Sequence, residues 1–166
     1  MPAGSTYEPI ATTTLSSALG TVTFSSISAG YTDLVLVGMR RYSNVGTGAQ
    51  NTFIRFNNDS TSLYSTTYLL NGGSGRITGV NSLYTSAGGN EVSDRYSIDV
   101  WNIFNYSNTN IFKTALLNYN FANNHKQIWC GLYRSKSAID RIDVIGDGGA
   151  TFAIGSTFTL YGITAA

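Results

Sequence analysis

Hydrophobic and polar residues alternate with a period of two along most of this chain. Val22 and Phe24 stand between threonines, and Phe158 and Leu160 repeat the arrangement near the end. Such alternation is typical of strands with one face on a core and the other facing water or a partner. It predicts strands at 7–14, 20–28, 32–42, 51–57, 63–70, 76–84, 95–104, 111–121, 126–134, 139–146 and 156–163.

Short runs of Gly, Asn and Asp separate these strands, as at 44–48, 71–75, 88–90 and 105–110. These residues tolerate positive φ and therefore mark turns. No stretch of helical length carries an apolar stripe of period 3.6. Many short strands with polar turns predict an all-β protein, a jelly-roll-like antiparallel β-sandwich of two sheets.

The domain prediction is a single β-sandwich over 21–166, preceded by an extended N-terminal arm at 1–20. The arm is rich in Thr and Ser and has one charged residue, Glu8. It has too little apolar content to fold alone. We expect either a frayed end or a segment that pairs with the sheet edge of a neighbouring molecule.

The composition argues against two classes of protein, nucleic-acid binders and disordered chains. Charged residues make up 11% of the 166 positions and the net charge is +1, which argues against nucleic-acid binding through a basic face. The 42% hydrophobic and 13% aromatic content argues against disorder. Thr, Ser, Asn and Gly number 20, 19, 15 and 18, which suits sheet surfaces and turns.

Targeting signals are also lacking in the sequence. No Lys or Arg precedes Arg40, and the longest apolar run is Leu34–Val37, so neither a signal peptide nor a membrane span is predicted. The single cysteine, Cys130, cannot form an internal disulfide. We therefore expect synthesis in a reducing cytoplasm without export, and no membrane partner.

Candidate catalytic residues are few, and none forms a motif. His125 is the only histidine and lies in a polar turn, so a solvated residue is favoured over a Ser–His or Cys–His pair. Cys130 shares a strand face with Ile128 and Leu132, which favours a small core residue over a reactive thiol.

The acidic residues and the glycine-rich run at 72–76 also give no clear indication of a catalytic or binding site. Asp140, Asp143 and Asp147 do not match a calcium loop, and alternation with Arg141 favours exposed cross-strand pairs. A glycosidase would need two carboxylates across a cleft, which no local pattern indicates. The run at 72–76 lacks a following helix, so we expect a hairpin and not a phosphate loop. We predict no enzyme activity, no metal site and no cofactor.

Three aromatic residues offer alternatives that the sequence leaves open. Trp101, Trp129 and Tyr133 alternate with the aliphatic residues of their strands, so they face outward if the aliphatic residues face the core. Outward rings would pack on a neighbouring subunit or stack on a sugar. If both faces of these strands are covered, the rings are buried.

The two ends of the chain resemble small virion proteins of tailed bacteriophages. The residues that carry the resemblance are YEPIATTTL at 7–15, VTFSSI at 22–27, YTDLVLV at 31–37 and GSTFTLYGI at 155–163. The similar proteins include capsid decoration (cement) proteins and domains of tail fibres. The resemblance implies a jelly-roll-like sandwich and a homotrimer. It implies no catalytic residues.

We therefore expect a capsid decoration protein on the capsid exterior of the virion, bound to the major capsid protein and stabilising the head. A short chain that ends after its last strand, with no shaft, favours this over a tail-fibre domain. The alternative is a tail receptor-binding module that binds a host glycan. The candidate assembly or ligand contacts are Tyr7, Ile10, Leu15, Trp101, Trp129 and Tyr133.

Overall fold

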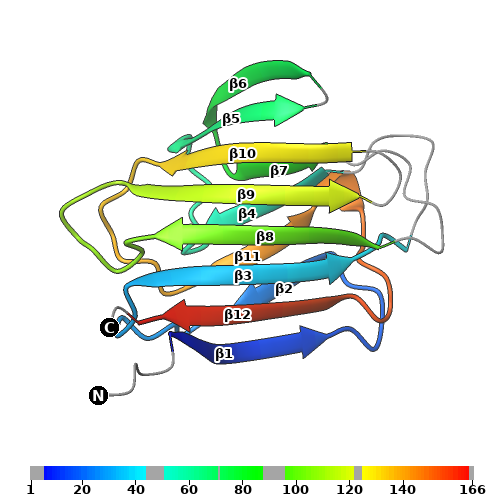
Figure 1. Cartoon of the computed structure of the whole chain (residues 1–166), viewed down its shortest axis with the longest axis horizontal. Helices are drawn as coiled ribbons and strands as arrows, with labels where there is room; N and C mark the ends of the chain where they lie inside the picture. Colours follow the sequence, from blue (N-terminus) through cyan, green and yellow to red (C-terminus); the bar gives the residue numbers. More distant parts are fainter. Residues whose placement is uncertain (1–5, 44–50, 71, 88–95, 122–124, 165–166) are drawn as a thin grey trace.

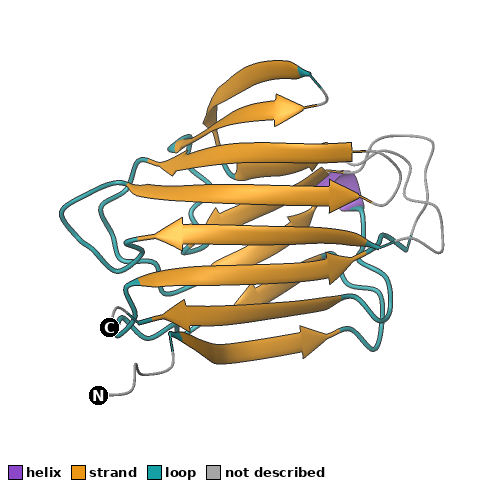
Figure 2. Cartoon of the chain, viewed as in Figure 1, coloured by secondary structure: helices purple, strands orange, loops and turns teal. Residues whose placement is uncertain are grey.

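The computed structural model describes residues 6–43, 51–70, 72–87, 96–121 and 125–164. These residues form two antiparallel sheets packed face to face, with one short 3₁₀ turn at Asp147–Gly149 (Figures 1 and 2). The all-β sandwich predicted from the alternation is confirmed.

Twelve strands make up the two sheets. The larger sheet has the order β1-β12-β3-β8-β9-β10-β5-β6, and the smaller has the order β2-β11-β4-β7. The strands are β1 (Tyr7–Thr14), β2 (Thr21–Phe24), β3 (Asp33–Arg40), β4 (Asn51–Phe56), β5 (Tyr64–Leu70), β6 (Gly73–Val80), β7 (Leu83–Ala87), β8 (Ser97–Phe104), β9 (Lys113–Phe121), β10 (His125–Tyr133), β11 (Ile142–Gly146) and β12 (Thr157–Ile163).

The chain crosses repeatedly between the sheets, as in jelly rolls. β1 and β3 lie in the larger sheet, whereas β2 and β4 lie in the smaller one, and β11 and β12 are divided in the same way. Only β5-β6 and β8-β9-β10 are neighbours in both sequence and space. Figure 1 shows the larger sheet in front and the smaller one behind it.

The core lies between the two sheets. The smaller sheet contributes Val22, Ile54 and Val144, and the larger contributes Leu36, Leu117 and further residues, all buried. Tyr64 and Tyr133 stack with ring centroids 4.6 Å apart, and Phe56 packs against Tyr133. Since burial of each large apolar side chain contributes roughly 1.5–3 kcal/mol, this layer is a main source of the stability of the sandwich.

The predicted strands match the observed ones closely, with one difference. The predicted strand at 76–84 is two strands, because β6 ends at Val80 and β7 begins at Leu83 in the other sheet. Between them, Asn81 and Ser82 form a bend that passes the chain from one sheet to the other. The glycine run belongs to a β5-β6 hairpin, as predicted, with Gly73 and Gly75 inside β6.

Part of the N-terminal segment is a strand of the larger sheet. Residues 7–14 form strand β1, which pairs with β12 of the same chain and is an outer strand of the larger sheet. Paired threonines explain the fit, because Thr12 and Thr14 hydrogen-bond through their hydroxyls to Thr159 and Thr157 at 3.1 and 3.0 Å.

The orientation of the strand faces is also opposite to one expectation. Trp101, Trp129 and Tyr133 are 2%, 3% and 2% exposed and lie in the core, so the outward-facing interpretation is wrong; the rings are buried although the opposite face of these strands is exposed. The alternating Ile128 is 49% exposed, and Cys130 is exposed as well. The large rings fill the space between the sheets, where they remove more apolar area from water.

Candidate interaction surface

The outer face of the larger sheet is rich in apolar side chains that none of the described elements covers. Alternation along each strand turns one set of residues toward the core and the other set outward. The outward set includes Val37 and Met39 on β3, Ile98, Val100 and Phe104 on β8, Leu116 on β9, Ile128, Cys130 and Leu132 on β10, and Leu69 on β5.

These residues form continuous rows across the sheet. The strand registers place Val37 beside Val100, Val100 beside Asn118, Asn118 beside Ile128, and Ile128 beside Leu69. Leu69 is 61% exposed and Ile128 is 49% exposed, so this end of the row is open to solvent. A contiguous apolar face of this kind is a feature of protein interaction sites.

A shallow hollow of about 490 Å³ lies on this face. Its floor is mostly apolar, and it runs from Phe104 on β8 to Arg76 on β6. The remaining lining residues are Ser65, Thr67, Thr114, Ala115, Leu116, Cys130, Gly131 and Leu132. The hollow is open, so it offers a contact surface and not an enclosed reaction chamber.

Charge is scarce on the outer face. Among the outward residues of β12, β3, β8, β9, β10 and β5 that the structure describes, only Asp33 and Lys126 are charged. Lys126 lies in the row of Met39, Ile98 and Asn120, at the β10 side of the face. Asp33 lies at the other end of β3, so the two charges occupy diagonally opposite corners.

The outer edge of the larger sheet at β1 is a second exposed feature. β1 pairs with β12 on one side and has no strand on its other side among the described residues. Its residues are mostly exposed, and the register shifts between Pro9 and Ala11. Free edges can accept a strand from a partner, although proline and a bulge restrict where pairing can continue.

Three of the candidate assembly or ligand contacts lie near the start of the chain, and each has a different environment. They are Tyr7, Ile10 and Leu15. Tyr7 is exposed and contacts the Tyr161 ring edge to face, with centroids 6.3 Å apart. Ile10 packs partly buried against the core, and Leu15 is fully within it. Only Tyr7 of these three lies in the open at the β1 edge.

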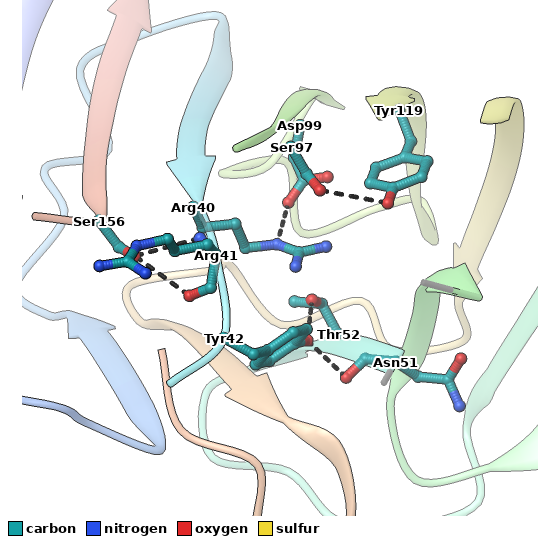
Figure 3. Close-up of polar contacts among 9 residues, drawn as sticks. All are labelled: Arg40, Arg41, Tyr42, Asn51, Thr52, Ser97, Asp99, Tyr119 and Ser156. Carbon is teal, nitrogen blue, oxygen red and sulfur yellow. Dashed lines mark hydrogen bonds and ion pairs between the residues drawn. The ribbon is translucent and has the colours of Figure 1, made fainter. Parts of the chain in front are cut away.

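A buried polar cluster lies between the sheets (Figure 3). Arg40 Nε donates a 2.6 Å hydrogen bond to Asp99 Oδ2, and both side chains are almost completely buried. The Arg40 guanidinium also lies over the Tyr42 and Tyr119 rings, at 5.1 and 5.8 Å from their centroids. Burial raises the pKa of Asp99, and the charge of Arg40 opposes that rise.

Hydroxyl groups extend this cluster toward both sheets. The Tyr42 hydroxyl donates to the Asn51 carbonyl at 2.8 Å and lies 2.6 Å from the Thr52 hydroxyl. Ser97 and Tyr119 share a hydrogen bond of 3.2 Å. These contacts join β3, β4, β8 and β9 (Figure 3). The cluster has a structural explanation, because it compensates a buried ion pair that would otherwise be costly.

Lys113 is a buried cation that holds a loop through backbone carbonyls. Its ammonium group donates to the carbonyls of Asn108, Ile111 and Lys136, the last two at 2.9 and 3.2 Å. Burial lowers the pKa of Lys113. Three carbonyl acceptors fix the connection between β8 and β9, so this lysine also has a structural role.

The acidic candidates do not assemble into a site. Asp143 is buried and accepts hydrogen bonds from Arg141, which directly precedes β11, and from Thr23 at 2.6 Å, so the expected exposed cross-strand pair is wrong. Asp147 accepts from Asn51 Nδ2 at 3.0 Å, and Asp140 is exposed. Among the described residues no group of His, Cys, Asp or Glu could hold a metal.

Some of the sequence candidates lie outside the described residues. These are the turns at 44–48, 88–90 and 123–124, and the pair Asp94 and Arg95. The backbone of His125 begins β10. In the described part of the chain no helix has the length and hydropathy to cross a membrane.

The open outer face of the larger sheet is not evident from the sequence. Ile98, Val100, Ile128 and Leu132 are the aliphatic half of their strands, and this pattern predicts that they face the core. The size of the alternating residues is the signal that could have identified the inward face, because Trp101 and Trp129 bury more apolar area than the aliphatic residues beside them. Comparisons with protein-family models, with curated proteins and with solved structures find no match for this chain.

Proposed function

We propose that this protein is a structural component of a bacteriophage virion, a capsid decoration protein that binds the outer shell and stabilises the head. The observation that carries the proposal is the open apolar outer face of the larger sheet, whose described outward residues from β12 to β5 are charged only at Asp33 and Lys126, with Arg76 on the neighbouring β6. Such a face suits packing against proteins, because apolar area is buried without desolvating charges.

Two further features support an assembly role. The β1 edge exposes backbone groups and Tyr7 for contact with a shell protein. The described polar and charged clusters, around Arg40, Lys113 and Asp143, are buried and engaged in holding strands and loops. These groups stabilise the sandwich and offer no open cleft with convergent reactive groups.

The receptor-binding alternative has less support. It depends on outward aromatic rings that would stack on a sugar, and Trp101, Trp129 and Tyr133 lie in the core. The open hollow carries Phe104 as its only aromatic lining residue among those described. We therefore propose the decoration role and use the tail tip as an outcome of the test.

Labelling of intact phage particles tests the location. Gold-labelled antibody against the protein should decorate the head in electron micrographs. Label confined to the tail tip would contradict the proposal and favour receptor binding, and unlabelled particles would contradict any exposed virion role.

Rebinding to capsids tests the activity. Purified protein added to capsids stripped of it should co-sediment with them and raise their resistance to heat. Tyr7→Ala should weaken co-sedimentation if the β1 edge contacts the shell, whereas Thr21→Ala on the exposed side of β2 serves as the control. Capsids that neither bind the protein nor gain heat resistance would contradict the proposal.

A further inference from the structure

We propose that the outer face of the larger sheet binds a second copy of this chain, forming a two-fold symmetric pair. This inference concerns the isolated protein and does not depend on the virion role. Its basis is the combination of apolar rows, scarce charge and the diagonal positions of Asp33 and Lys126.

The size of the face is sufficient for a stable pair. Strands lie about 4.8 Å apart and rise about 3.4 Å per residue, so six strands of seven residues span on the order of 700 Å². A standard interface buries about 800 Å² of accessible surface on each partner. The face from β12 to β5 is therefore in the range that a stable dimer needs.

The charges are complementary to a second copy. Consider a two-fold axis that lies in the plane of the face and crosses the line between Asp33 and Lys126 at its midpoint and at a right angle. Rotation about this axis places the aspartate of each copy opposite the lysine of the other. Asp33 Oδ1 accepts a 2.6 Å hydrogen bond from the Asn105 backbone, which fixes the carboxylate at this corner. Lys126 is exposed at the other corner. One pairing thus satisfies both charges in both copies.

The same axis predicts which residues meet their own counterparts. With regular strand spacing, it passes close to Val100 on β8, Leu116 on β9 and Cys130 on β10. Apolar residues at the axis pack against themselves without electrostatic cost. Cys130 of one copy comes to face Cys130 of the other, and it is the only cysteine in the chain.

The oligomeric state is measured by analytical ultracentrifugation of the purified chain. The expected mass is twice 17.8 kDa. Val100→Lys places two ammonium groups opposite each other at the axis and should give monomers with an unchanged circular dichroism spectrum. Thr21→Lys adds the same charge to the exposed side of β2 and should leave the pair intact.

Charge exchange tests the orientation of the two copies. Asp33→Lys or Lys126→Asp alone brings like charges together twice and should raise the dissociation constant roughly tenfold. The double variant restores opposite charges and should return the dissociation constant to that of the unaltered chain. Equal weakening by the singles and the double would overturn the proposed axis.

Cross-linking gives an independent readout. A short bifunctional maleimide should join two native chains through Cys130, and the Cys130→Ser variant should give no product. A chain that sediments as a monomer at all soluble concentrations, or as a trimer, would overturn the pairing. A dimer that Val100→Lys leaves intact would overturn it too. The pairing and the virion role use the same face, so a confirmed pair would leave the β1 edge as the surface for the shell, and the gold labelling tests the location separately.

Discussion

Arg40 Nε and Asp99 Oδ2 lie 2.6 Å apart inside the sandwich, and the Arg40 side chain has no exposed surface. The pair joins the neighbouring strands β3 and β8 on the core side of the larger sheet. Removal of one member of a buried pair is strongly destabilising, because the other charge loses its compensation in a medium of low dielectric.

Asp99→Leu should therefore lower the free energy of unfolding by about 3–5 kcal/mol, measured by urea denaturation. The double variant Arg40→Met/Asp99→Leu should recover most of that loss, since no charge remains buried. If the double variant is as unstable as the single one, the carboxylate is needed for more than its pairing with Arg40.

Gly131 is a position where the packing between the sheets allows no larger residue. A Cβ atom there would lie 2.7 Å from the nearest side-chain carbon of Leu83, which is fully buried on β7. Gly131→Ala should cost about 1–3 kcal/mol of unfolding free energy through overpacking. Gly20→Ala is the control, because its nearest neighbour would lie 3.7 Å away. Equal stability of the two variants would show that Leu83 moves aside freely.

The strands could be predicted from the sequence because their alternation is local. Val22 with Phe24, and Phe158 with Leu160, mark inward positions that the structure confirms as buried. β1 was also located, but its partner could not be, because pairing with β12 joins residues more than 140 positions apart.

The choice of inward face failed on β8 and β10 for a physical reason. On β8 the inward residues include Ser97 and Asp99, whereas the outward ones include Ile98 and Val100, so the buried half is the more polar one. Asp99 is tolerated inside because Arg40 neutralises it. That pairing is tertiary, and no local pattern reveals it. Because the local pattern does not show which half of these strands faces inward, it also does not show that the outer face is apolar and open.

Trp129 and Ile128 test this assignment, because they are neighbours on β10 with opposite orientations. Trp129 donates from Nε1 to Gln127 Oε1 at 2.8 Å and packs against Tyr68 in the core. Trp129→Ala should cost about 3–5 kcal/mol in urea denaturation. Ile128→Ala should cost under about 1 kcal/mol, since half of its side chain is already in water. A reversed order would mean that β10 turns its other face to the core.

Asp59 links the β4–β5 loop to the end of β10, and its hydrogen bonds make stability depend on pH. Its carboxylate accepts from the backbone and hydroxyl of Thr61 and, at 2.7 Å, from the Tyr133 hydroxyl. Hydrogen bonding from Thr61, and then from Tyr133, holds the pKa of Asp59 below its ordinary 3.8, and burial opposes this. The ionised form is therefore favoured in the folded state.

An acid whose pKa is lower in the folded state stabilises the fold fully above its unfolded pKa, and that stabilisation is lost as the pH falls through the folded pKa. Urea denaturation across a pH series from neutral to below 3.8 should thus show a difference between the native chain and Asp59→Asn that shrinks with acid. Asp140→Asn is the control, since that exposed carboxylate accepts no hydrogen bond among the described residues. A difference between the native chain and Asp59→Asn that stays constant through the acid range would mean that these hydrogen bonds do not distinguish the charged carboxylate from the neutral one.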